Sequence, residues 1–248
     1  MSTVTVDVKQ TGKLETRSPY VFVGLPDAGL VGIIAATYLV DNFDMKEIGY
    51  IDSTRFPPVV IVRDSEVKHA IRIYGKDKFV VVISEIPLGP SIAVQFSKSL
   101  LTWVKKLEPK LLVNITGLPV QNRLQIEKPE VIGLATRKDM TELLRSQNIA
   151  LFKDGVLFGP YAAIIKECVS QKVPTLTLFA QSHLNFPDPT ASIEALSVVN
   201  KVLKTNIDLG PLKEEAEMIR IKTRELMKQT EGVLRESKIE GTHPTIYR

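Results

Sequence analysis

The sequence predicts an α/β domain, a three-layer α/β/α sandwich around a mixed but mostly parallel sheet, followed by a long C-terminal helix. Short runs rich in β-branched residues alternate with longer segments whose apolar residues recur at helical spacing, as in strands joined by crossover helices. The segment Phe79–Ser84 is a nearly continuous apolar run, which is typical of a strand covered on both faces. After residue 211 the chain becomes highly charged and free of proline up to about residue 238, which indicates the helix.

The individual elements follow in chain order. A strand over residues 20–23 leads into a helix over residues 29–40, and two further strands, 59–62 and 69–74, are separated by a charged turn at 63–68. This hairpin-like pair predicts that the sheet is mixed, while right-handed crossovers elsewhere place helices on both faces. The remaining elements are the strand Phe79–Ser84, a helix at 91–107, strands at 111–116 and 131–136, a helix at 138–147, an extended run at 155–158, a helix at 160–171 and a strand at 175–179.

The composition narrows the class of protein. The 248 residues carry 32 basic and 28 acidic side chains, a formal net charge of +4, and 44% hydrophobic residues. The two signs are mixed and no block of Lys and Arg is present, so nucleic-acid binding is not favoured. No apolar run has the length or freedom from charge that a membrane span needs. The single cysteine, Cys168, lies in an apolar helical pattern. We therefore expect a buried thiol, no disulfide within the chain and a cytoplasmic location.

The C-terminal part divides from the body at residue 209, which gives a core domain over residues 1–209 and a helix over residues 210–238. Apolar residues recur there every seven positions, with small residues between them, so the helix has a heptad seam. The seam packs either on its own domain or against another subunit, and the sequence leaves both alternatives open. The large seam residues are Leu212, Ile219, Leu226 and Val233.

One glycine-containing stretch, VGLPDAGLVG at residues 23–32, occupies the place where phosphate-binding loops occur, after a strand and before a helix. A P-loop needs Lys and Ser or Thr after its second glycine, whereas Leu30 and Val31 stand there. Asp27 would also repel an anion. We therefore interpret the stretch as a tight strand-to-helix turn rather than a nucleotide site.

The carboxyl ends of the predicted parallel strands are the place where such sheets bind ligands. Asp27 and Glu85 come directly after two of the strands, and a carboxylate with a raised pKa there could act in acid–base chemistry. No catalytic triad, nucleophile elbow or metal-ligand spacing is present in the sequence. We therefore assign no catalytic residue, no metal and no cofactor. A small-molecule enzyme of the phosphorylase or hydrolase kind, with a cleft at these strand ends, is kept as the alternative.

The last residues, 239–248, are predicted to form a flexible tail, because Gly241 and Pro244 end the helix. The tail finishes with Ile246, Tyr247 and Arg248. An aliphatic side chain, an aromatic ring with a hydroxyl group and a terminal carboxylate are suited to a narrow pocket on a partner protein.

Several segments, taken in their order and spacing, resemble the archaeal homologues of the proteasome assembly chaperone family. They cover about residues 15–235, and the element Pro187-Asp188-Pro189 is the most specific of them. The segments are VFVGLPDAGLVGIIAATYLV, SEIPLGP, ITGLP, GVLFGPYAAII and FPDPTASIEAL.

The resemblance implies a fold similar to nucleoside phosphorylases but no enzymatic activity. It further implies docking of a C-terminal hydrophobic-Tyr-X motif, here Ile246, Tyr247 and Arg248, into pockets between α subunits of the proteasome core. The expected protein is an ATP-independent assembly chaperone, gate-opening activator or both. We expect a homo-oligomer, because several tails on one particle bind more tightly than one. A tetramer is favoured, with a trimer as the alternative.

Overall fold

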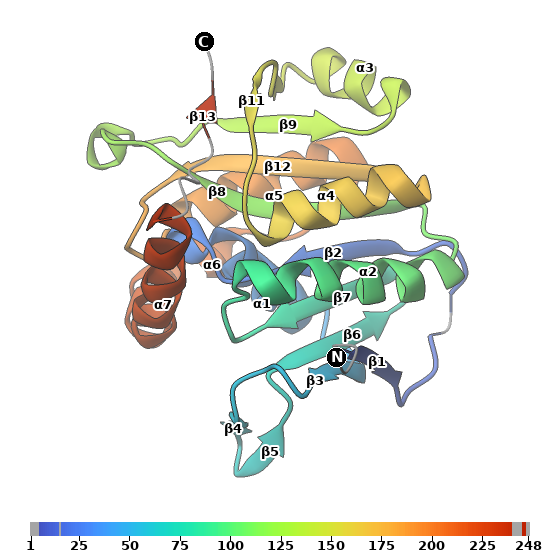
Figure 1. Ribbon diagram of the computed structural model, residues 1–248. Coiled ribbons are helices and arrows are strands. Elements are labelled where there is room, and N and C mark those ends of the chain that lie inside the picture. Colours follow the sequence, from blue (N-terminus) through green and yellow to red (C-terminus); the bar gives the residue numbers. More distant parts are fainter. Residues whose placement is uncertain (1–4, 15, 240–244, 247–248) are drawn as a thin grey trace.

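The computed structural model describes residues 5–14, 16–239 and 245–246, and a nine-stranded sheet forms its centre (Figure 1). The four central strands, in the order β7-β2-β8-β12, are parallel, and the strands on both sides of them join antiparallel. The predicted mixed sheet is thus confirmed. The full order is β1 (Val6–Gln10), β3 (Lys46–Ser53), β6 (Ile71–Lys76), β7 (Phe79–Ser84), β2 (Tyr20–Gly24), β8 (Leu111–Pro119), β12 (Thr175–Ser182), β9 (Val131–Ala135) and β10 (Ala150–Leu151).

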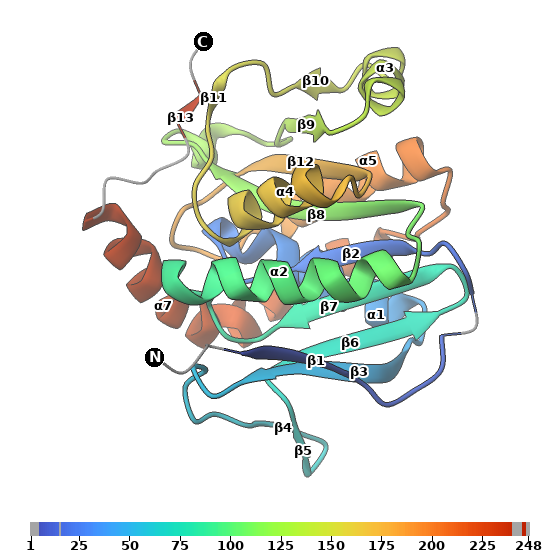
Figure 2. The same cartoon turned by 45° about the vertical axis from the view of Figure 1, so that its right-hand side comes forward.

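Helices cover both faces of the sheet, so the three-layer prediction is confirmed as well. In Figures 1 and 2, α2 (Pro90–Lys106) and α4 (Pro160–Gln171) lie in front of the sheet, with α1 (Val31–Asn42) and α5 (Pro189–Leu203) behind it. A shorter helix, α3 (Lys138–Ser146), packs beside β9 and β10. Strand residues alternate between two hydrophobic cores: Phe22 packs on the α1 and α5 side, and Val21 packs on the α2 and α4 side.

The main elements that were not predicted from the sequence are β1, β3 and α5 (Pro189–Leu203). The strands β1 and β3 pair at the sheet edge, and half of their residues are exposed and polar, so their apolar signal is weak. Helix α5 begins directly after Asp188, so the last residue of the Pro187-Asp188-Pro189 element is the first residue of the helix.

The predicted hairpin needs a correction. The strand at 59–62 and the charged turn at 63–68 are in fact β4 (Ile61–Arg63) and β5 (Glu66–Lys68), a separate two-stranded sheet. The turn is only Asp64 and Ser65, both with positive φ, which suits a two-residue hairpin turn. Pro57 and Pro58 precede the hairpin, and their missing N–H groups explain why pairing starts later.

The long C-terminal helix is present but interrupted near its start. A short helix, α6 (Gly210–Glu214), is followed after Glu215 by α7 (Ala216–Ile239), so Leu212 does not lie on the same helix as the other seam residues. Among the described residues, no helix combines the length and the apolar character that crossing a membrane requires.

Candidate functional site

A cavity of about 100 Å³ lies at the carboxyl ends of the parallel strands, where the sequence places a ligand site. Its wall is mostly apolar, and the residues come from the turns after β2 and β7, from β8 and β12, from the start of α4 and from α7. The principal wall residues are Pro26, Pro87, Leu157, Phe158, Tyr161 and Phe179. Among the described residues that line the cavity, Asp27 is the one with a carboxyl group, and none is a lysine, arginine or histidine.

Asp27 is buried in this wall with only one of its oxygens satisfied by a side chain. The hydroxyl group of Thr116 donates a hydrogen bond to Asp27 Oδ2. Within the described part of the chain, Oδ1 is fully buried and has no hydrogen-bond partner. Burial raises the pKa of the Asp27 carboxyl well above its usual value, and the Thr116 hydroxyl and the Gly117 amide offset only part of this effect. A carboxylic acid in such a place is either a strained structural group or part of a binding site.

Two glycines, one near the start of α1 and one on β8, allow close packing around the turn after β2. A Cβ on Gly32 would lie 2.2 Å from the carbonyl oxygen of Ile115 and 2.3 Å from the Tyr161 hydroxyl. A Cβ on Gly117 would lie 2.1 Å from the carbonyl oxygen of Ala28. Both positions therefore exclude any larger residue, and they bring Asp27 against the end of β8.

Tyr161, in the first turn of α4, contacts the backbone at the end of β2. Its hydroxyl accepts a hydrogen bond from the backbone N–H of Leu25 at 2.8 Å and lies 3.3 Å from the carbonyl oxygen of Val23, to which it donates. Burial raises the pKa of Tyr161 well above its usual value, and the nearby Asp27 raises it further. Because the hydroxyl is engaged with the backbone of β2, it leaves Asp27 Oδ1 without a partner.

Glu85, the second carboxylate predicted for the cleft, does not line this cavity. It forms ion pairs with Arg72 on β6 (Nη2 to Oε2, 2.7 Å) and with Arg63 on β4. The two ion pairs connect the β4–β5 hairpin to β6 and to the end of β7. The structure therefore gives Glu85 a structural role and leaves Asp27 alone at the cavity.

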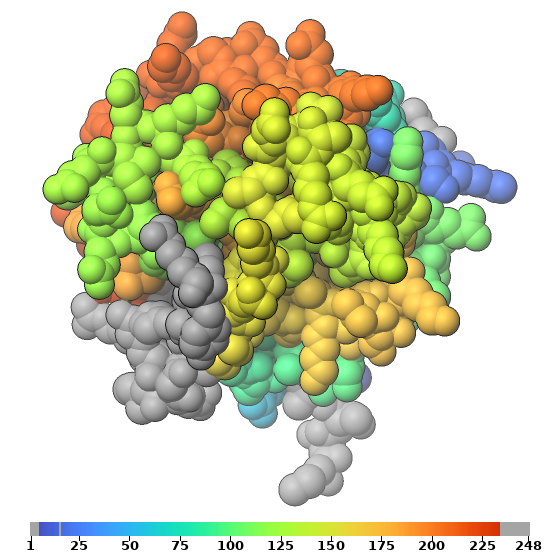
Figure 3. Space-filling model, turned by 90° about the horizontal axis from the view of Figure 1, so that it is seen from above, coloured from blue at the N-terminus to red at the C-terminus, as the bar shows by residue number. Residues whose placement is uncertain are grey.

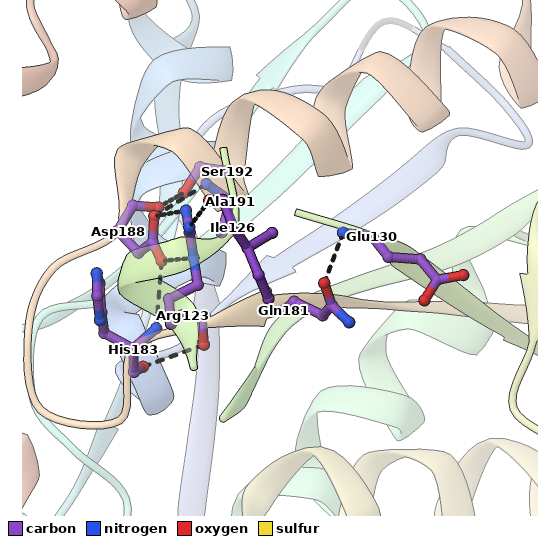
Figure 4. Close-up of polar contacts among 9 residues, drawn as sticks. Arg123, Ile126, Glu130, Gln181, His183, Asp188, Ala191 and Ser192 are labelled. Atoms are coloured by element: carbon purple, nitrogen blue, oxygen red, sulfur yellow. Dashed lines mark hydrogen bonds and ion pairs between the residues drawn. The ribbon is translucent and has the colours of Figure 1, made fainter. Parts of the chain in front are cut away.

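Asp188 forms a second buried acidic centre, which the sequence analysis did not assign (Figure 4). The Arg123 side chain points at it and donates two hydrogen bonds, from Nε to Oδ2 at 2.7 Å and from Nη2 to Oδ1 at 2.9 Å. The backbone N–H groups of His183 and Ala191 donate to the same carboxylate at 3.2 and 3.1 Å. Asp188 thus caps α5 and fastens the loop around Arg123 to it. An aspartate directly before a proline at a helix start was the available signal.

The strand-end residues Ser182 and His183 form no catalytic arrangement. The hydroxyl of Ser182 donates to the carbonyl oxygen of His183 at 3.1 Å. The ring of His183 packs edge-on against Phe186, and burial lowers its pKa. Within the described residues, no group of three or more His, Cys, Asp or Glu side chains could hold a metal ion.

The four seam residues of the C-terminal helices contact the body to different degrees. Leu212 is buried in the core on the α1 and α5 side, and Ile219 and Leu226 are half-buried against the same core. Val233 is half-buried and lines the Asp27 cavity, together with the buried Thr230. The structure thus places this face of α6 and α7 against its own domain.

The tail residues fall partly outside the described structure. Tyr247 and Arg248 lie outside it, while the backbone of β13 (Thr245–Ile246) pairs antiparallel with β11 (Gly155–Val156). The register places Ile246 opposite Gly155 and Thr245 opposite Val156. The yellow segment that contains β11 lies at the surface in Figure 3, and Val156 is 44% exposed.

Several known proteins are similar to this chain in sequence or in fold. The crystal structure of Pyrococcus furiosus PbaA, an archaeal homologue of proteasome-assembly chaperone, has a TM-score of 0.84 and 27% identity, covering 92% of this chain and 98% of that chain. An uncharacterised protein of Methanocaldococcus jannaschii is 25% identical over 231 residues, 93% of this chain and 94% of that protein. Pyrococcus furiosus PbaB, an archaeal proteasome activator, shares the fold (TM-score 0.75, 20% identity, 94% of this chain and 99% of that chain).

The sequence also matches the PAC2 family over residues 21–227. This range runs from β2 into α7 and includes both buried aspartates, the helices on both faces and all of the described cavity lining except Thr230 and Val233. The match therefore covers most of the chain, and the chain belongs to the PAC2 family.

Proposed function

We propose that this protein is a proteasome-binding factor that assists assembly of the proteasome core, opens its gate or does both. The observation that carries the proposal is the relation to PbaA, an archaeal homologue of proteasome-assembly chaperone, at 27% identity over nearly the whole of both chains. The factor is cytoplasmic, non-enzymatic and independent of ATP. The VGLPDAGLVG stretch supports the last point, because its Gly32 packs against Ile115 of β8 and Tyr161 of α4 and its Asp27 is buried.

The proposed contact is made by Ile246, Tyr247 and Arg248, which enter pockets between neighbouring α subunits of the core. The tyrosine ring buries apolar area while its hydroxyl keeps a hydrogen bond, and the carboxylate of Arg248 pairs with a basic side chain of the pocket. Ordering such a tail costs about 1–2 kcal/mol per residue in backbone entropy. One tail therefore binds weakly, and we propose a homo-oligomer, a tetramer in the first instance, that presents several tails at once.

The test is incubation of the full chain with purified proteasome core, scored by co-migration on native gels. Removal of residues 246–248 is expected to abolish co-migration while circular dichroism and thermal unfolding stay nearly unchanged, because the pairing of β13 with β11 covers only two residue positions. Tyr247→Phe is the matched control: it retains the ring and is expected to weaken binding much less than Tyr247→Ala. Undiminished co-migration of the truncated chain would overturn the tail mechanism.

Two further measurements separate the roles within this proposal. Faster cleavage of short peptides by the mature core indicates gate opening, whereas faster ring formation from separated α subunits indicates assistance in assembly. Native mass spectrometry of the protein alone gives the number of subunits. No association with either the mature core or its α subunits would overturn the proposed function as a whole.

A further inference from the structure

The β4–β5 hairpin projects from the sheet edge and has an exposed apolar face (Figures 1 and 2). Val62 and Val67 are opposite each other in the register, so their side chains point to the same face of the hairpin, and they are 64% and 70% exposed. Because side chains alternate along a strand, Ile61 and Arg63 point to the other face. There Ile61 packs against the core on the α2 and α4 side, and Arg63 pairs with Glu85. The hairpin is therefore attached to the body by one face, while its valine face is exposed in the described structure.

The outer edge of β5 (Glu66–Lys68) presents backbone hydrogen-bonding groups at Val67. The turn residues Asp64 and Ser65 both have positive φ, and the residues that flank such a two-residue turn form a hydrogen-bonded pair. Because hydrogen-bonded and non-hydrogen-bonded pairs alternate in an antiparallel ladder, the next pair, Val62 and Val67, directs its N–H and C=O groups to the outer edges. Within the described residues, β4 and β5 form a sheet of only two strands. Such a sheet is marginal in water by itself, and its edge is a template for a further strand.

The charges beside Val67 indicate which strand fits this edge. Glu66 and Lys68 flank the valine with opposite signs. When two copies of β5 pair antiparallel about Val67, each Glu66 lies opposite the Lys68 of the other copy, and opposite charges directly across a ladder are favourable. An edge protected only against pairing would favour one sign of charge, because like charges repel their own copies. β4 (Ile61–Arg63) lacks this complementarity, since one of its outer residues is apolar and the other is basic.

We propose that β5 is a contact between two copies of this chain, in which Val67 of one copy pairs with Val67 of the other around a two-fold axis. The hairpins then form a four-stranded sheet in the order β4-β5-β5-β4, with a row of four valines, from positions 62 and 67 of both copies, on one face. Within one copy Lys68 Nζ already lies 2.5 Å from Glu66 Oε2, so the four charges of the two copies form a network on the other face. The contact is isologous. It adds an interface to the proposed homo-oligomer and does not rest on binding to the proteasome.

Cysteine substitution of the two valines tests the geometry. Paired copies of residue 67 have Cα atoms about 5.5 Å apart, a distance that a disulfide spans, whereas copies of residue 62 are separated by three strand spacings, about 14 Å. Under mild oxidation we expect Val67→Cys to form a covalent dimer at least tenfold faster than Val62→Cys, the matched control on the same face. Non-reducing gel electrophoresis measures both rates, and the buried Cys168 is common to both variants. Equal rates, or faster crosslinking of Val62→Cys, would overturn the proposed pairing.

Charge reversal tests whether the partner is a second copy of β5. Glu66→Lys and Lys68→Glu are each expected to weaken self-association at least tenfold, measured by analytical ultracentrifugation, because both pairs between copies become like-charged. A one-to-one mixture of the two variants restores opposite charges between unlike copies. We therefore expect mixed pairs with the affinity of the unsubstituted chain, counted by native mass spectrometry with one variant ¹⁵N-labelled. Mixing leaves each hairpin's own charges as they are, so it separates effects between copies from effects within a hairpin.

The two-fold axis also restricts the size of the oligomer, because every copy must have a partner at β5. A monomer, an odd number of subunits, unchanged self-association in both charge variants or an absence of mixed pairs would overturn the proposal. Proteasome binding is a separate readout. A chain that self-associates through β5 but does not bind the proteasome core would support this contact and overturn the proposed function.

Discussion

Two buried aspartates follow parallel strands at the same end of the sheet, and they differ in how far their oxygens are satisfied. Asp188 accepts hydrogen bonds from two nitrogens of Arg123 and from two backbone amides. Asp27 Oδ1 accepts none within the described residues. The first arrangement is that of a structural clamp, whereas the second leaves one oxygen of a buried carboxyl group unsatisfied. Burial alone does not separate the two arrangements, but the count of donors does.

The contacts between Asp188 and Arg123 predict that replacing each of them by alanine lowers the stability by a different amount. Asp188→Ala leaves the buried Arg123 guanidinium with the carbonyl oxygen of Ile126 as its one acceptor among the described residues and removes the α5 cap, so we expect a loss of about 3–5 kcal/mol in unfolding free energy. Arg123→Ala leaves the carboxylate with two backbone donors, so its loss is expected to be smaller. Urea denaturation followed by circular dichroism measures both. Equal losses, or a larger one for Arg123→Ala, would contradict the clamp.

At the residue level, the two strand-end carboxylates differ in position: Asp27 lines the cavity, and Glu85 is not among the described lining residues. Both follow apolar strands, and strand-end position alone assigned them to one cleft. The difference arises because β6 joins β7 antiparallel, which places Arg72 within reach of Glu85. That register depends on the hairpin between the two strands, and nothing in the local sequence around Glu85 encodes it. The Arg123–Asp188 pair, separated by 65 residues, was hidden for the same reason.

Among the elements, α7 shows how a heptad pattern describes an apolar stripe without naming its partner. Among the described side chains of α7, Thr230 and Met227 are buried. Thr230 is one of the small residues of the predicted seam, Met227 lies next to the seam, and Ile219 and Leu226 are half-buried against the same domain. A single stripe on a body of this kind has the same period as a helix–helix seam. Met218 and Ile221 are exposed on α7. A contact between α7 and another subunit therefore remains a proposal, and these two residues are available for it.

Two methionines on this helix test its attachment to the body. Met227 is 2% exposed and belongs to the core on the α1 and α5 side, so Met227→Ala is expected to cost about 2 kcal/mol or more. Met218 is 54% exposed, and Met218→Ala is expected to change the free energy of unfolding by less than about 0.5 kcal/mol. Chemical denaturation of the two variants makes the comparison within one residue type. A loss below about 1 kcal/mol for Met227→Ala would mean that α7 is only loosely attached.

The elements that the sequence predicted are those with strong apolar periods, and the boundaries moved where turn chemistry intervened. The central strands β2, β7, β8 and β12 carry dense β-branched runs and were all predicted. The β4–β5 hairpin was misplaced because its two-residue turn depends on positive φ at Asp64 and Ser65, and neither residue is a glycine. The break at Glu215 between α6 and α7 was not predicted, because no proline or glycine stands at that position.

On the scale of the whole molecule, the described part of the C-terminal tail, β13, returns to the body at β11. β13 pairs with β11 over two residue positions, and within the described residues these two strands form a sheet of their own. So short a ladder is marginal in water. The proposed docking of the tail therefore requires release of this pairing, after which residues 240–248 span at most about 30 Å from the end of α7.

A reversible crosslink tests whether that release is necessary. Val156 and Thr245 are Cα partners in the antiparallel pair, and directly opposite residues have Cα atoms about 4.5–5.5 Å apart, which a disulfide spans. Val156→Cys with Thr245→Cys, once oxidised, leaves only three residues beyond the bridge, about 10 Å when extended. We expect the oxidised double variant to lose co-migration with the proteasome core and the reduced form to regain it. Cys168 is buried, and burial raises the pKa of its thiol to about 11, so it stays outside the exchange.

The single variants Val156→Cys and Thr245→Cys supply the matched controls, because each carries the substitution without the bridge. Both are expected to bind the core with or without oxidant. If the oxidised double variant binds as well as the reduced one, the tail docks from its place on β11 or docking uses another surface. Truncation at residue 245 then decides between these two outcomes, since only the first requires Ile246, Tyr247 and Arg248. The crosslink and the truncation together separate the path of the tail from its contact.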